Sequence, residues 1–217
     1  MSLSEKTMSL NVELTGHCFV KTSTSNLPPI VLLHGFQDRP VLLHDRLFGE
    51  LRVDRAIYVP QGPFPVPHAK EGGFREAYAW YFVDPTANRV FIPPDTAIRS
   101  LEQMFTNLDL RTPSVVIGFS QGGYLAPLLS KILPISNLIL LGAGGRSEFY
   151  DSVDPKTEIH FVHGEKDDVV VPERSAQIQE TLSQRGFLVS RTVLPNQTHR
   201  MTTAFGRQIL KILSEES

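Results

Sequence analysis

The chain has 217 residues and a formal net charge of −2, and hydrophobic residues make up 41% of it. This length favours one domain, residues 1–217, with a sizeable core, and the composition is that of a folded rather than a disordered protein. The near-neutral charge argues against nucleic acid or an anionic membrane surface as the main partner.

The N-terminus and the cysteine content indicate the cellular compartment of the protein. The first ten residues contain no long apolar segment of the kind found in signal peptides, and no apolar run approaches the ~20 residues that span a bilayer. A second Met at position 8 suggests that residues 1–9 are flexible or vector-derived. Cys18 is the single cysteine, which excludes an intrachain disulfide and suits a reducing compartment. We therefore expect a cytoplasmic protein without integral membrane association.

Strand-like and helix-like segments alternate along most of the chain. Short apolar or β-branched runs bounded by turn residues predict strands at residues 10–22 (one or two edge strands), 30–33, 56–59, 115–117, 138–141, 158–162 and 187–194. Apolar residues at helical spacing predict helices at residues 39–52, 95–108, 124–133, 172–185 and 202–213. This alternation predicts a mostly parallel central sheet with helices on both faces.

The least regular part of the chain is the segment 61–94, which is rich in Pro, Gly and aromatic residues. A connection this long in a compact domain is usually functional or disordered, and its aromatic content argues against disorder. Between Leu141 and Glu158 there is no room for a separate helical lid domain. Any cover over a site must therefore come from the segment 61–94.

The most informative stretch is PSVVIGFSQGGY, residues 113–124. It predicts a strand, a sharp turn and a helix, with Ser120 in a strained conformation at the apex of the turn. Glycines stand at positions 118 and 122 because a side chain at either place would clash across so tight a bend. The helix N-terminus offers free N–H groups to an oxyanion. We interpret Ser120 as a nucleophile; the alternative is a plain connection between strand and helix.

A serine hydroxyl is a poor nucleophile until a base, held in place by a third group, removes its proton. The chain supplies Ser120, then the pair Asp167–Asp168 and then His199, which is the chain order of α/β-hydrolases. All of them, like the dipeptide His34–Gly35, follow predicted strands, so they should share the carboxyl edge of the sheet. The alternative for His199 is a surface-loop histidine, which fits its order and placement less well.

Several motifs resemble the carboxylesterase/phospholipase family of small α/β-hydrolases, which includes acyl-protein thioesterases and many bacterial esterases. They are GFSQGG at residues 118–123, LLHG at 32–35, HGEKDDVVVP at 163–172 and the late His199, so the match spans about residues 30–201. The resemblance implies the α/β-hydrolase fold and a serine hydrolase that acts on uncharged carboxylic esters or thioesters.

The acid has two neighbouring candidates. The family-like pattern H-G-x-x-D, counted from His163, selects Asp167, whereas counting back from Pro172 selects Asp168; we favour Asp167. Two adjacent aspartates without further ligands at suitable spacing do not support a metal site, and no cofactor is expected.

For the oxyanion hole we expect two backbone N–H groups, that of Gln121 after the nucleophile and that of Phe36 after His34–Gly35. Backbone donors tolerate almost any side chain at these two positions. The next residue, Gln37, stands where the resembling family often has Gly.

Together these residues predict an esterase that acts through an acyl-enzyme intermediate on small or soluble esters. We expect Trp80 or Tyr81 to line the acyl pocket or to buttress it; the alternative is that these aromatic residues only pin the loop to the core. A thioesterase or a peptidase-like hydrolase would use the same three groups. From a different class, a non-catalytic binding module on the same fold stays open, although a binder has no need of all three.

Overall fold

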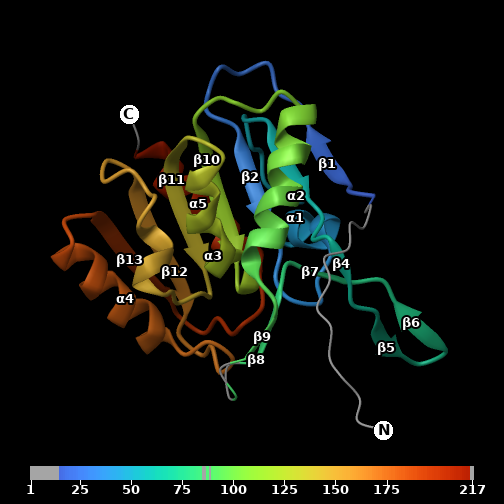
Figure 1. The fold of residues 1–217 in the computed structure, drawn as a ribbon. Coiled ribbons are helices and arrows are strands. Elements are labelled where there is room, and N and C mark those ends of the chain that lie inside the picture. The colour runs from blue at the N-terminus through green and yellow to red at the C-terminus, as the bar shows by residue number, and fades with distance from the viewer. Residues whose placement is uncertain (1–14, 85–86, 88, 216–217) are drawn as a thin grey trace, which may run out of the picture.

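The computed structural model describes residues 15–84, 87 and 89–215, and its centre is a seven-stranded sheet in the order β1-β3-β2-β10-β11-β12-β13 (Figure 1). The strands are β1 (Cys18–Lys21), β2 (Ile30–Leu33), β3 (Ile57–Pro60), β10 (Ser114–Phe119), β11 (Ile135–Leu141), β12 (Glu158–Gly164) and β13 (Leu188–Leu194). Each neighbouring pair is parallel except β1 with β3. The predicted mostly parallel sheet is therefore confirmed.

Helices cover both faces of this sheet. They are α1 (Pro40–Phe48), α2 (Pro94–Asn107), α3 (Gln121–Leu125), α4 (Pro172–Gln184) and α5 (Thr203–Ser214), with the 3-10 turns η1 (Ala126–Lys131) and η2 (Ser147–Tyr150). The sheet has a hydrophobic core on each face, and successive residues of β2 belong to different cores because side chains alternate across a strand. Val31 belongs to the core that α2 and α4 complete, and Leu32 to the one that α1 and α5 complete. Figure 1 shows α2 crossing in front of the sheet.

The parallel strands explain why the candidate residues gather at one edge. All residues of β2 and β10 are buried, as expected for apolar runs covered on both faces. Parallel strands end at the same edge of a sheet, so the loops that follow β2, β10, β12 and β13 emerge side by side. These loops carry His34, Ser120, Asp167 and His199.

The segment 61–94 is more ordered than its sequence predicts. Its described residues form three two-stranded sheets: β4 (Phe64–Pro65) with β7 (Tyr78–Ala79), β5 (His68–Lys70) with β6 (Gly73–Arg75), and β8 (Phe82–Asp84) with β9 (Arg89–Ile92). Figure 1 shows the β5–β6 hairpin projecting away from the central sheet. Strands of two to four residues are too short to show a periodic pattern, so they could not be predicted.

Other differences from the sequence prediction concern the ends of elements. The helix predicted at 124–133 begins at Gln121 and changes to 3-10 geometry at Ala126, because Pro127 lacks the N–H that an α-helix would need there. The helix predicted at 39–52 ends at Phe48. Of the edge strands predicted at 10–22, the described residues show β1, whereas residues 10–14, like residues 1–9, lie outside the described part.

The connection between β11 and β12 contains the short turn η2 and no helical lid, as predicted. Within the described residues, no helix is both long and apolar enough to cross a membrane.

Candidate active site

Ser120 stands at the turn between β10 and α3 with φ 50° and ψ −116°. Such a positive φ is strained for a residue with a side chain and costs about 1–3 kcal/mol. The turn is as tight as the sequence predicts. A Cβ atom at Gly118 would collide with the carbonyl oxygen of Gly122, and one at Gly122 would lie 2.5 Å from the carbonyl oxygen of Leu33.

The imidazole of His199 lies between Ser120 and Asp167. Its Nε2 is 3.0 Å from Ser120 Oγ, and its Nδ1 is 2.7 Å from Asp167 Oδ2. Because an ionised carboxylate can only accept, Nδ1–H donates to Asp167, which leaves Nε2 free to accept the serine proton. The three residues come from the loops after β10, β12 and β13, as predicted.

The two candidate acids have different surroundings. Asp167 is buried, and its Oδ1 accepts the backbone N–H groups of Val169 (3.1 Å) and Val170 (2.9 Å). Asp168 is exposed to solvent. The geometry thus favours Asp167, the residue preferred from the H-G-x-x-D pattern.

His163 supports the loop that carries Asp167. Its ring is fully buried, Nε2–H donates to the carbonyl oxygen of Val170 (2.6 Å), and Nε2 lies 3.4 Å from Asp167 Oδ2. Burial is the main cause that lowers the pKa of His163, so the ring is neutral near pH 7. The following Gly164 lets two loops approach closely, because a Cβ there would lie 2.5 Å from the carbonyl oxygen of Gln197.

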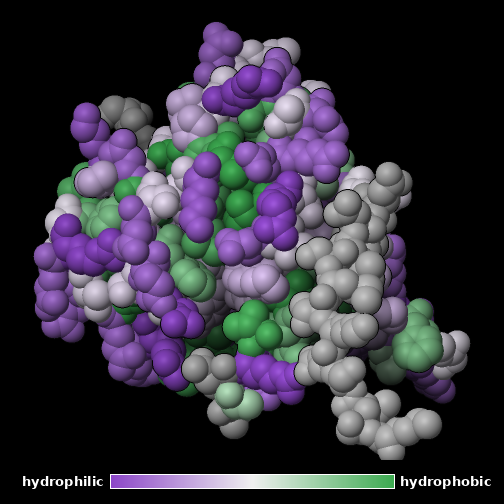
Figure 2. Space-filling view, viewed as in Figure 1, coloured by the Kyte–Doolittle hydropathy of each residue, from purple (hydrophilic) through white to green (hydrophobic). Residues whose placement is uncertain are grey.

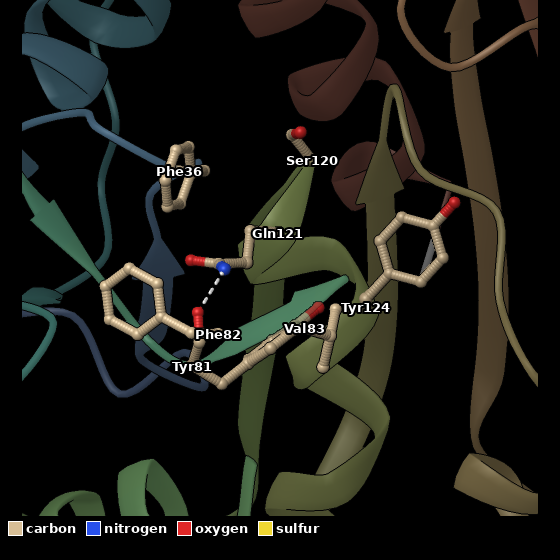
Figure 3. Close-up of a pocket in the computed structure, with 7 residues that line it drawn as sticks. All are labelled: Phe36, Tyr81, Phe82, Val83, Ser120, Gln121 and Tyr124. Carbon is tan, nitrogen blue, oxygen red and sulfur yellow. Dashed lines mark hydrogen bonds between the residues drawn. The ribbon is translucent and has the colours of Figure 1, made fainter. Parts of the chain in front are cut away.

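The loop after β2 lies directly against the serine turn. A Cβ atom at Gly35 would be 3.4 Å from Ser120 Cβ, and one at Gly122 would be 2.6 Å from the carbonyl oxygen of His34. Phe36 follows and lines the same cavity as Ser120 and Gln121 (Figure 3). This arrangement suits the predicted pair of backbone donors at Phe36 and Gln121.

His34 fixes that loop from the inside of the molecule. Its Nε2 accepts the N–H of Gly62 (2.9 Å), its carbonyl oxygen accepts the indole N–H of Trp80 (2.7 Å), and the two rings stack with centroids 4.7 Å apart. Burial lowers the pKa of His34 to about 4, which keeps the imidazole neutral. His34 therefore orders the loop rather than acting as a base.

The loop tolerates Gln37 in place of glycine by adopting a positive φ of 53° there. This conformation explains why glycine is favoured at the position. The following Asp38 holds the strained turn, since its carboxylate accepts the backbone N–H of Arg39 (2.9 Å) and the guanidinium of Arg46 (3.0 Å). Its carbonyl oxygen also accepts the N–H of Tyr78 (3.0 Å).

A cavity of about 310 Å³ opens beside the serine, and most of its lining is aromatic or aliphatic (Figure 3). The lining residues are Phe36, Tyr81, Phe82, Val83, Ser120, Gln121 and Tyr124. Tyr81, one of the two aromatic residues expected to line or buttress an acyl pocket, lines this cavity, and Trp80 is fully buried behind it. Sequence reasoning missed Phe82, Val83 and Tyr124. Tyr124 could have been found, because it lies in the first turn of the helix that follows Ser120.

The strand order, the flanking helices and the serine turn define an α/β-hydrolase. A family model described as serine hydrolase (FSH1) matches residues 25–201. The chain therefore belongs to the serine hydrolase (FSH1) family, and the resemblance to small hydrolases of this fold is confirmed.

Several solved structures have a similar fold. Esterase PE8 has a TM-score of 0.67 at 21% identity, over 94% of this chain and 99% of its own. Acyl-protein thioesterase 2 of Zea mays has a TM-score of 0.66 at 18% identity, over 93% and 99%. A carboxylesterase of Bacillus cereus has a TM-score of 0.64 at 13% identity, over 92% and 94%. At these identities the likeness shows the fold alone. No curated protein matches the chain.

Proposed function

We propose that the protein hydrolyses uncharged carboxylic esters through an acyl-enzyme intermediate on Ser120. The observation that carries this proposal is the chain of contacts from Ser120 Oγ through the imidazole of His199 to Asp167, 3.0 and 2.7 Å long, beside an apolar cavity. The match to the serine hydrolase family supports the same reaction class, and esterases and a thioesterase are among the proteins of similar fold.

In this proposal Ser120 Oγ attacks the acyl carbonyl while His199 Nε2 takes its proton, and Asp167 stabilises the resulting imidazolium. The backbone N–H groups of Gln121 and Phe36 stabilise the oxyanion. The imidazolium then protonates the leaving alcohol. Water attacks the acyl-enzyme with the same base, which releases the acid and restores the serine.

The cavity indicates which part of the substrate it receives. Five of its seven lining residues are aromatic or aliphatic, so it suits an acyl chain without charge. The wall formed by Tyr81, Phe82 and Val83 takes the place that a separate lid would have. Because the cavity is small and open, we propose small or soluble esters as substrates.

A thioester is a second candidate substrate, favoured by the similar fold of a thioesterase. The same three groups would serve, since the leaving thiol is displaced from the same carbonyl carbon. A peptidase-like reaction has no specific support. A non-catalytic binding module would not need a serine held at hydrogen-bond distance from a histidine that a buried carboxylate orients.

We also propose that residues 1–217 act as a single domain in the cytoplasm. The described strands outside the segment 61–94 join one sheet, and a single cysteine, Cys18, suits a reducing compartment.

A fluorophosphonate probe tests the proposed nucleophile. The wild-type protein should be labelled on Ser120 with one probe per chain, and preincubation with p-nitrophenyl butyrate should slow the labelling. The Ser120→Ala variant is the control and should take up no probe. A folded wild-type protein that stays unlabelled would contradict the proposal.

A further inference from the structure

A residue of the cavity wall and the residue before it lie in a gap between strands. β7 ends at Ala79 and β8 begins at Phe82, so Trp80 and Tyr81 belong to neither strand. Both are buried, with 0% and 8% of their surface exposed. Backbone N–H and C=O groups in a buried segment need partners, because an unpaired group is costly away from water.

The side chain of Gln121 provides two of those partners. Its Oε1 accepts the backbone N–H of Trp80 (2.9 Å), and its Nε2–H donates to the carbonyl oxygen of Tyr81 (2.8 Å). Figure 3 shows the second of these bonds reaching from the helix to the wall. One amide thus bonds to the backbone at both residues of the gap, as the backbone of a neighbouring strand would.

The chemistry of this contact is specific to glutamine. An amide both accepts and donates, whereas the carboxylate of a glutamate only accepts and the thioether of a methionine does neither well. Asparagine would be one methylene shorter. Gln121 is also the first residue of α3, directly after the nucleophile, so the amide ties the wall to the residue next to Ser120.

We propose that the Gln121 side chain is a specificity-determining group that sets the distance between the nucleophile and the wall formed by Tyr81, Phe82 and Val83. It thereby sets how the activity on esters of longer acyl chains compares with the activity on acetyl esters. This inference rests on the proposed esterase function and adds a role for the side chain to the role proposed for the backbone N–H of the same residue.

Loss of the Gln121 bonds should move the backbone more at Tyr81 than at Trp80, because of the other contacts in this region. The indole of Trp80 is already fixed by its bond to the carbonyl oxygen of His34. Beyond Tyr81 the wall becomes open, since 45% of the surface of Val83 is exposed. A shift of the chain at Tyr81 therefore moves the open part of the wall. An octanoyl chain, which extends along the wall, should respond to this shift more than an acetyl group, which ends beside the serine.

The test compares Gln121→Glu and Gln121→Met with the wild-type protein. Gln121→Glu loses the donor to Tyr81, Gln121→Met loses both bonds without adding charge, and both keep the backbone N–H. Gln103→Glu, on the exposed side of α2, is the control for replacing an amide by a carboxylate. For each protein kcat/KM is measured on p-nitrophenyl acetate, butyrate and octanoate. The octanoate-to-acetate ratio is the readout, because it does not depend on the fraction of active protein.

Both Gln121 variants should lower this ratio about tenfold, while Gln103→Glu leaves it unchanged. A ratio unchanged in both Gln121 variants would overturn the inference and leave the amide a purely structural role, whatever the melting temperatures. A change in Gln121→Glu alone would also overturn it, because added charge would then be the cause. Failure of the proposed function has a different signature: the wild-type protein would turn over none of the three esters, and the inference would fall with it.

Discussion

Two regions meet at the candidate active site, and they are built differently. Ser120, Asp167 and His199 follow long strands that are paired with neighbours in the central sheet. The cavity wall belongs to the segment 61–94, whose strands pair two by two outside that sheet. The strands that carry the three candidate residues are positioned by backbone pairing in the central sheet. The wall pairs with the backbone of β9 at Phe82 and Val83, and at Trp80 and Tyr81 it also depends on bonds from the side chain of Gln121. Mutations should therefore affect catalysis in the first region and selectivity in the second.

The largest effect is expected for Ser120→Ala in the strand-end region. Loss of a triad nucleophile costs on the order of 10⁶ in kcat, and the fold should stay intact because β10 and α3 keep their packing. Hydrolysis of p-nitrophenyl acetate beside a melting curve checks both expectations. Turnover of the variant at near the wild-type rate would remove Ser120 from the mechanism.

The second-largest effect on kcat is expected at Asp167, and it should distinguish this residue from Asp168. Asp167→Asn removes the carboxylate that orients His199 and should reduce kcat by up to about 10⁴, as in a serine protease triad. Asp168→Asn, at an exposed neighbour, is the matched control and should have little effect. Steady-state kinetics of both variants measure the difference. The reverse ranking would make Asp168 the acid, and equal mild losses would exclude both.

The pH dependence of stability tests the contact between the two regions, because His34 lies where they meet. Its folded pKa of about 4 is below the ordinary 6.5, so between these pH values the unfolded chain binds more protons than the folded one. The stabilisation from keeping His34 neutral is complete above about pH 6.5. It falls as the pH drops towards 4, by up to about 3 kcal/mol.

Urea denaturation at pH 7 and at pH 4.5 measures this loss of the free energy of unfolding. His34→Gln should make the loss smaller, although His163, whose pKa is also lowered, keeps part of it. His68→Gln, on the exposed strand β5, is the control and should show the wild-type loss. An unchanged pH dependence in His34→Gln would show that His34 is not held neutral by the fold.

A smaller and more selective effect is expected in the wall. Tyr81→Ala removes a side chain that lines the cavity, so kcat/KM should shift by about tenfold between acetyl, butyryl and octanoyl esters. Trp80→Phe removes the indole N–H behind the wall and should lower the melting temperature with parallel losses on all three esters. If Tyr81→Ala lowers the melting temperature but leaves the chain-length profile unchanged, Tyr81 only pins the loop to the core.

The contrast between the regions also explains what could be predicted from the sequence. The parallel sheet and the positions of Ser120 and His199 were predictable, because buried strands are continuous apolar runs and catalytic groups follow their carboxyl ends. Asp167 was favoured over Asp168 by the H-G-x-x-D pattern, but its burial and its bonds to Val169 and Val170 depend on the three-dimensional path of the loop. The places of Phe82 and Val83 in the cavity lining and the bonds of the Gln121 side chain were not predictable, since the bonds join residues about forty positions apart in the chain.

The most direct test of the proposed mechanism is the mass of the enzyme during turnover. The protein is mixed with excess p-nitrophenyl acetate, quenched in acid within the first turnovers and analysed by mass spectrometry after digestion. The acyl-enzyme mechanism predicts one added acetyl group on the peptide that contains Ser120, together with an initial burst of nitrophenol, and neither in Ser120→Ala. An acetyl group on a different residue, or steady turnover in the Ser120→Ala variant, would contradict it.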